Sequence, residues 1–252
     1  MDEPSDLQKT FSNLVSVVGA YECVFALIDL LVNTFHAYIL SRRHMRTSSM
    51  NSILLGIALV DMIFPIVAIK KQARLWVFGS GNCTAPQGSI ETNIDWILYT
   101  VRDDFRRCST WLGLSLAVVR TVAVRNTMNQ SFNYISRPAF GWKVVVASIG
   151  FSSFLSIFYY LRFQPVPTGT FWQPSTSCPG YTEGYQAPIF VYQEQALFTF
   201  GNAIFRKLYL LLVGMLGKFV PCAMFPVVTI LLIRELAKAR KSREKATKDK
   251  RK

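Results

Sequence analysis

Residues 103–121 read DDFRRCSTWLGLSLAVVRT, in which a short charged group precedes an apolar run and then Arg120. The apolar run, residues 108–119, is too short to cross a bilayer by itself, since a spanning helix needs about 20 residues. If this segment spans a membrane, its charged side chains lie in or near the hydrocarbon zone, where charges are costly. Charges persist there when they pair or face an aqueous cavity, so this group is a candidate functional site. Its members are Asp103, Asp104, Arg106 and Arg107.

The composition and the recurrence of apolar segments indicate a membrane protein. Hydrophobic residues make up 51% of the chain and charged residues only 17%, against about 25% charged residues in soluble domains. Five segments are long enough to span a bilayer as helices. They cover approximately residues 14–40, 48–69, 94–124, 142–163 and 208–233. We therefore predict an all-α, multi-pass membrane helix bundle.

The distribution of basic residues predicts the orientation of these spans. Lys and Arg are concentrated after the first span, after the third span and in residues 234–252. Because basic residues favour the cytoplasmic side, five spans place the N-terminus outside and the C-terminus in the cytoplasm, at the plasma membrane. Residues 1–13 would be an extracellular tail and 234–252 a basic cytoplasmic tail. The net charge of +13 reflects this topology, so we expect a lipid bilayer as partner and no nucleic acid.

Two cysteines fall in connections that this topology places outside. Cys83 follows the second span and Cys178 follows the fourth, where oxidation is favoured. A disulfide between them is our interpretation, and two free thiols are the alternative. Asn82-Cys83-Thr84 is also a glycosylation sequon, which makes Asn82 a candidate modification site.

Three further residues stand out within the apolar segments. Asn33 in the first span is expected to hydrogen-bond a neighbouring helix. Asp61 in the second span is either an ion or proton site or a buried partner of Asn33, and these two roles are compatible. Pro221 in the fifth span is expected to bend the helix, because proline lacks a backbone donor.

The charged group of the third span admits two interpretations. On a helix, the two aspartates lie three or four residues before the two arginines, so they can form ion pairs along one side. The group then either binds a charged ligand, with the long connection 164–195 as a lid, or neutralises itself and only stabilises helix packing.

No catalytic constellation is evident. The two histidines, His36 and His44, have no Cys or carboxylate at metal-ligand spacing. Nucleophile elbows, phosphate loops and dinucleotide fingerprints are missing from the sequence. We therefore expect neither an enzyme nor a bound cofactor or metal.

Several of these features together resemble the rhodopsin-like G-protein-coupled receptors. They are Asn33, Asp61, Trp76-Val77-Phe78-Gly79 ahead of Cys83, Cys178, Arg120 and Pro221. More narrowly, Ser48-Ser49-Met50-Asn51 and residues 103–113, ending in Val119-Arg120-Thr121, look like the nematode serpentine receptor class W family of chemoreceptors. That family is similar to receptors for FMRFamide-like neuropeptides.

The resemblance implies a role for each of these residues. Arg120 would contact the G-protein side and switch partners on activation, and Asn33 and Asp61 would belong to a buried polar network. The disulfide of Cys83 and Cys178 would tie the second outer loop to the third span. Pro221 would be the flexible point of the fifth span. The pocket would be lined by Asp103, Asp104, Arg106 and Arg107.

The sequence departs from the family pattern at two points. Val119 stands where most rhodopsin-like receptors have an acidic residue before the arginine. The family has seven spans, with a rhodopsin-like topology, whereas five are found here, so we expect a truncated product, a fragment or an incomplete gene model.

The expected function is that of a G-protein-coupled receptor for an extracellular peptide or small ligand, most simply a short neuropeptide. Its partners would be a heterotrimeric G protein and, through receptor dimerisation, a second receptor. The alternative is a non-signalling membrane protein that associates with full-length receptors and alters their assembly or trafficking. A transporter ranks third, since charges within membrane spans also mark substrate paths.

Overall fold

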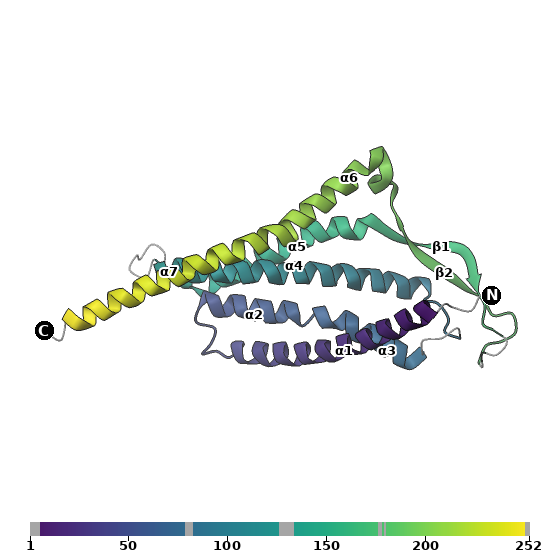
Figure 1. Cartoon of the computed structure of the whole chain (residues 1–252), viewed down its shortest axis with the longest axis horizontal. Coiled ribbons are helices and arrows are strands. Elements are labelled where there is room, and N and C mark those ends of the chain that lie inside the picture. Colours follow the sequence, from purple (N-terminus) through teal and green to yellow (C-terminus); the bar gives the residue numbers. More distant parts are fainter. Residues whose placement is uncertain (1–5, 79–82, 126–133, 176–177, 179, 250–252) are drawn as a thin grey trace.

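The computed structural model describes residues 6–78, 83–125, 134–175, 178 and 180–249, which form a bundle of long helices (Figure 1). The first helices are α1 (Asp6–Leu40), α2 (Ser49–Asp61), α3 (Phe64–Phe78), α4 (Ser89–Arg125) and α5 (Pro138–Arg162). A strand pair, β1 (Phe163–Trp172) and β2 (Ala187–Glu194), precedes α6 (Ala196–Gly214), the π-helix η2 (Met215–Phe219) and α7 (Val220–Asp249). The predicted helical membrane bundle is confirmed.

Among the described residues, four helical stretches are long and apolar enough to cross a membrane, judged by length and composition. They are Val17–Leu40, Ser49–Val77, Pro138–Arg162 and Ala203–Lys241. The fifth long helix, α4, is not among them, since charged side chains interrupt its apolar sequence. Large apolar side chains such as Leu31, Val32 and Phe35 point away from the bundle on α1, as lipid contact requires. The chain is a multi-pass membrane protein.

The second predicted span is two helices rather than one. The chain turns at Met62 and Ile63, where the Ile63 amide donates to the Val60 carbonyl over a shorter interval than in an α-helix. Pro65, in the first turn of α3, has no amide hydrogen to donate to the carbonyl of Asp61. The break follows from this missing donor, and α3 then continues to Phe78, beyond the predicted end at residue 69.

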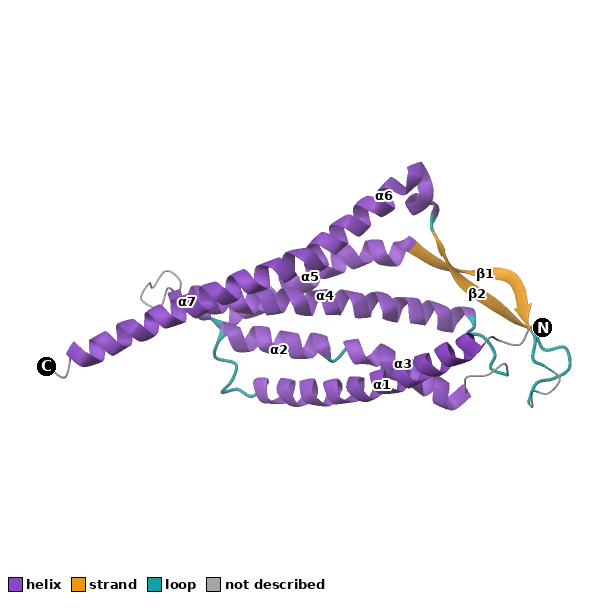
Figure 2. Cartoon of the chain, in the orientation of Figure 1, coloured by secondary structure: helices purple, strands orange, loops and turns teal. Residues whose placement is uncertain are grey.

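The long connection 164–195 contains a β-hairpin that the sequence analysis treated as a loop. Figure 2 shows the two strands at one end of the bundle, which we call the hairpin end. β1 and β2 are antiparallel, with Phe163 opposite Glu194, and their register shifts between Pro167 and Phe171. The hairpin projects from the ends of α5 and α6, so it lies over this end of the bundle (Figure 2).

The fifth span contains a π-helical turn directly before Pro221. The helix begins at Ala196, ahead of the predicted start at residue 208, and changes to the π form over Met215–Phe219. Pro221 cannot donate to the carbonyl four residues earlier, that of Gly217, and a wider turn accommodates the lost bond. The prediction of a distortion at Pro221 thus has a specific structural counterpart.

The core lies towards the opposite end of the bundle, between α2, α4 and α5. Ile53, Cys108, Leu112 and Val145 are its buried centre. Close approach of α5 to α2 depends on Gly141, because a Cβ atom there would lie 2.7 Å from the Ser52 Cβ and closer still to the Ser49 carbonyl oxygen. Ser49 and Ser52 are buried at this contact.

Replacing Gly141 with alanine should therefore destabilise the bundle. We expect Gly141→Ala to cost about 1–3 kcal/mol, because the two backbones must move apart. Gly150→Ala on the same helix is the matched control, since nothing lies within 4 Å of its added methyl. Alanine there should be neutral or gain about 0.5–1 kcal/mol from helix propensity. Thermal unfolding in lipid nanodiscs measures both, and equal midpoints for the two variants would contradict the close contact.

Candidate functional site

The charged group of α4 forms ion pairs along the helix. The Asp103 carboxylate accepts from Arg106 Nη2 at 2.9 Å and from Arg107 Nη1 at 2.8 Å. Arg107 is only 5% exposed, whereas Arg106 is 56% exposed. The buried arginine and the exposed one thus share a single carboxylate, and the polar group extends from the interior to an open surface.

Asp104 faces a different direction and joins α4 to α5. Its carboxylate accepts from the Ser153 hydroxyl at 2.8 Å, and its backbone carbonyl accepts from the Ser152 hydroxyl at 2.7 Å. One turn along α5, the Ser156 hydroxyl accepts from Arg107 at 2.6 Å. The three serines were not predicted as partners of the charged group, although their spacing on α5 places them on neighbouring faces of one helix.

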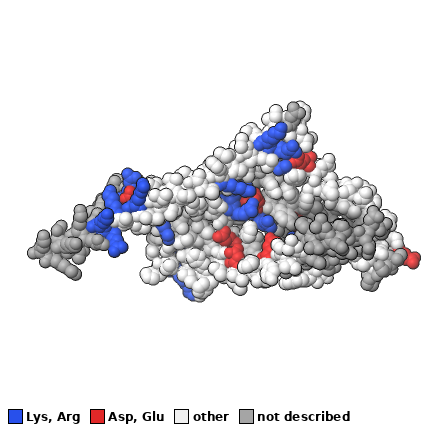
Figure 3. All heavy atoms as spheres, viewed as in Figure 1, with Lys and Arg blue, Asp and Glu red and all other residues white. Residues whose placement is uncertain are grey.

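A cavity of about 290 Å³ opens beside three of the four predicted charged residues. We call it the central cavity, and α4, α5, α6 and η2 supply its lining. The lining residues are Asp103, Arg106, Arg107, Thr110, Tyr159, Tyr209, Leu210, Val213, Gly217 and Lys218. Asp104 does not line it, so the structure gives no support to Asp104 as a pocket residue. Figure 3 shows basic and acidic side chains gathered midway along a mostly uncharged face.

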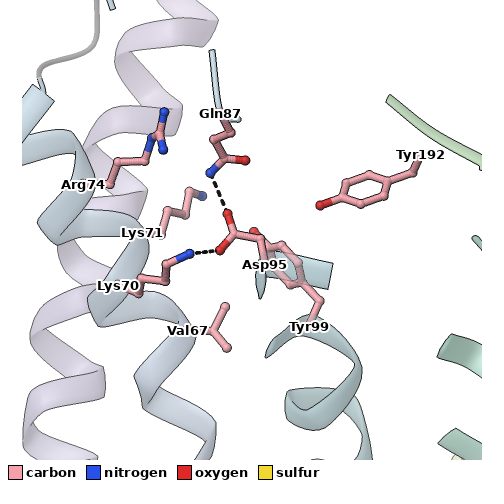
Figure 4. Close-up of a pocket in the computed structure, with 8 residues that line it drawn as sticks. All are labelled: Val67, Lys70, Lys71, Arg74, Gln87, Asp95, Tyr99 and Tyr192. Carbon is pink, nitrogen blue, oxygen red and sulfur yellow. Dashed lines mark hydrogen bonds and ion pairs between the residues drawn. The ribbon is translucent and has the colours of Figure 1, made fainter. Parts of the chain in front are cut away.

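A second cavity, also of about 290 Å³, lies at the hairpin end (Figure 4). Lys70 of α3 forms an ion pair with Asp95 of α4, and Gln87 donates to the same carboxylate at 2.6 Å. Tyr192 of β2 faces this group from across the cavity (Figure 4). This ion pair was not predicted, because nothing in the local sequence indicates that Lys70 and Asp95 are partners.

A third cavity, of about 500 Å³, lies between α1, α3 and α4. Its charged lining residues are Glu22, Asp29 and Arg102, and Phe25 is one of the apolar ones. Arg102 lies 3.9 Å from Glu22. Acidic groups therefore outnumber basic ones here.

The hairpin is attached to the bundle at three places. Cys83, before α4, forms a disulfide with Cys178 in the connection between the strands. Trp96 of α4 is 7% exposed and contacts Tyr159, Phe163 and Tyr192 with ring centroids 5.1–5.4 Å apart. The third attachment is at the strand ends.

At the strand ends, Glu194 accepts from two arginines. Arg162 of α5 donates through Nε at 2.7 Å, and Arg206 of α6 donates through Nη1 at 2.7 Å. The hydrogen bond from Arg162 is the main reason that the pKa of Glu194 lies below its ordinary value of 4.5. This carboxylate links the helices on either side of the hairpin.

Asn33 and Asp61 have separate hydrogen-bond partners in the described structure. Asn33 donates to Asp29 Oδ1 on its own helix at 2.8 Å, whereas Asp61 faces the Ser109 hydroxyl of α4. Arg120 is exposed near the opposite end, beyond the buried Val119. Pro221 is fully buried next to η2, and Asn82 lies outside the described residues. Within the described ranges, no three His, Cys, Asp or Glu side chains gather to hold a metal ion.

Comparison with known families decides the class of protein. The sequence profile described as "Serpentine type 7TM GPCR chemoreceptor Srw" matches residues 20–252, which is nearly the whole chain. The chain belongs to the Srw family of serpentine chemoreceptors. The expected family is therefore confirmed, and this is a family of receptors rather than a class of enzymes. No functionally curated protein matches the chain significantly.

Loss of the disulfide should loosen the hairpin of this Srw protein. The bond closes a loop with a sequence separation of 95 residues, for which chain entropy predicts a stabilisation of about 4.7 kcal/mol. We expect the double variant Cys83→Ser, Cys178→Ser to unfold at a lower temperature in nanodiscs. Cys222→Ser is the control, because that thiol is free and exposed. An unchanged unfolding midpoint in the double variant would contradict this prediction. It would mean that the contacts of Trp96 and Glu194 hold the hairpin without the disulfide.

Acid should weaken the attachment at Glu194. A carboxylate whose pKa is lowered by folding stabilises the folded state above its ordinary pKa, and this stabilisation is lost as the pH falls through the lower, folded-state pKa. We therefore expect the unfolding temperature to decrease once the pH drops below about 4.5. The variant Glu194→Gln should lack this part of the pH dependence. Glu183→Gln, in the connection between the strands, should leave it unchanged. Identical pH profiles for both variants would contradict the assignment.

Proposed function

We propose that this Srw receptor binds an extracellular ligand, a short neuropeptide, in its central cavity and signals to a heterotrimeric G protein. The hairpin end then faces the outside at the plasma membrane, and the basic end of α7 faces the cytoplasm. One observation carries the proposal: the Asp103, Arg106 and Arg107 group borders a cavity instead of being enclosed by packed helices. Charges at such a depth are retained when a ligand or water reaches them.

The exposure of Arg106 supports a binding role over a purely structural one. A self-neutralised group would have every charge buried and paired, whereas more than half of the Arg106 side chain is accessible. Its guanidinium has five N–H donors, and the contact with Asp103 uses only one of its nitrogens. Donors therefore remain for a ligand.

The hairpin supports a peptide as the ligand. A two-stranded sheet has a free edge on each strand, and an extended peptide can pair with such an edge. The second cavity lies between this hairpin and the ends of α3 and α4, where Lys71 makes no ion pair with any described residue. A peptide entering from the hairpin end would meet the backbone donors of a strand edge and the charge of Lys71 before it reached the central cavity.

The fifth span supports a route from the cavity to the G protein. Gly217 of η2 lies against Arg107, since a Cβ atom there would be 3.2 Å from the Arg107 Cδ. π-Helical turns are common at functional sites, and a ligand beside Arg107 would bear on this one. Arg120 is exposed, lies about 20 Å beyond Arg107 along α4 by helical rise, and makes no ion pair with a described residue. It is therefore accessible to a cytoplasmic partner.

The test is direct binding to the chain purified in lipid nanodiscs. The probes are amidated tetrapeptides ending in Arg-Phe-amide, together with the same peptides ending in a free carboxylate. We expect Arg106→Gln to weaken binding of the best peptide about tenfold or more, because a hydrogen bond to a charged group is worth about 1.5–3 kcal/mol.

Arg102→Gln is the matched control, one turn earlier on α4 and facing the third cavity. Equal losses in both variants would indicate a general effect on the helix, and no loss in Arg106→Gln would exclude the central cavity. The same peptide should also raise nucleotide exchange on a heterotrimeric G protein. Binding without exchange would favour the other role, a membrane protein that associates with full-length receptors.

A further inference from the structure

The central cavity carries more positive than negative charge. Among its described lining residues are three cations, Arg106, Arg107 and Lys218, and a single carboxylate, Asp103. Lys218 belongs to η2, the element whose Gly217 lies against Arg107 of α4. The excess was not evident from the sequence, where two aspartates and two arginines balance.

The single carboxylate is already occupied. One oxygen of Asp103 accepts from Arg106 and the other from Arg107. Asp104 does not line the cavity, and one of its carboxylate oxygens accepts from Ser153 on α5. Lys218 makes no ion pair with any residue that the structure describes, so its charge has no internal counter-ion.

Arg107 also retains an unused donor. Its Nε is buried and has no hydrogen-bond partner among the described residues. The side chain as a whole is only 5% exposed. A buried donor without a partner is costly, and more so for a charged group. The arginine nevertheless lines the cavity, so an incoming acceptor would satisfy it.

We propose that the central cavity accepts an anionic group of its ligand, a carboxylate in the simplest case, between Arg106 and Lys218. This inference rests on the ligand-binding role proposed above and adds the charge class of the ligand. Uncompensated cations within membrane helices are costly, and an anion removes that cost. Leu210 and Val213 line the same cavity and suit an apolar group next to the anion. A peptide with a free C-terminal carboxylate or an acidic side chain has this form, whereas an amidated cationic peptide does not.

The charge preference can be measured without any peptide. Val213→Cys places a thiol in the cavity, in a chain that also carries Cys222→Ser to remove the exposed thiol. The thiol at residue 213 is then modified in nanodiscs of neutral phosphatidylcholine by two methanethiosulfonate reagents. One carries an anionic sulfonatoethyl group and the other a cationic trimethylammonioethyl group, and the two modification rates are compared. Phe25→Cys, in the acidic third cavity, is the reference site.

We expect the anionic-to-cationic rate ratio to be about tenfold higher at residue 213 than at residue 25, given the size of short-range charge interactions. Lys218→Gln should lower the ratio at residue 213 and leave that at residue 25 unchanged. Equal ratios at the two sites, or no effect of Lys218→Gln, would overturn the inference.

Two further arms identify the source of the anion. Slower modification at residue 213 in nanodiscs with anionic phosphatidylglycerol would assign the site to a lipid headgroup, and protection by a carboxylate-ended tetrapeptide would assign it to a soluble ligand. Either result supports anion binding. An anionic preference without binding of any peptide would refute the proposed neuropeptide function and leave the anion site standing. Peptide binding without an anionic preference would refute the anion site and leave the proposed neuropeptide function standing.

Discussion

The rest of this structure depends on the need to satisfy the charges of α4 inside a bundle of apolar helices. Lipid cannot solvate Asp103, Asp104, Arg106 and Arg107, so the protein must supply their partners. It does so within α4, through the ion pairs of Asp103, and across to α5, through the hydroxyls of its serines. These contacts determine which face of α5 meets α4. They leave unsatisfied the buried Oδ1 of Asp104, the exposed side of Arg106 and the Nε of Arg107, and these two arginines line the central cavity.

The hairpin end follows a similar logic with different chemistry. The hairpin has too small a surface to be stable alone, since isolated two-stranded hairpins are marginal in water. Covalent, aromatic and ionic attachments hold it instead: the disulfide, the Trp96 cluster and the two arginines on Glu194. Because these attachments reach α4, α5 and α6, a ligand that moves the hairpin would act on the same helices that line the central cavity.

The elements that were predicted and those that were missed differ in the range of the interactions that specify them. Long apolar segments specify membrane helices locally, and Pro65 and Pro221 each leave a carbonyl without its donor, so distortions near them follow from the sequence. The strands of 163–194 were missed because their sequence is rich in Pro and Gly, and because the contacts that attach the hairpin come from distant residues such as Cys83 and Trp96. The pairing of Lys70 with Asp95 was missed for the same reason, since it joins residues on two helices.

The sequence by itself determined that this chain is a membrane helix bundle with a charged group at residues 103–107, and it carried enough of the Srw pattern to identify the family. Only the tertiary structure decided which of the four charges faces a cavity. Adjacent residues on a helix point about 100° apart, so Asp103 and Asp104 cannot both face the same neighbour. The sequence shows both carboxylates but not the positions of α5 and η2, and it is the packing of these two elements that gives one aspartate to the cavity and the other to the serines.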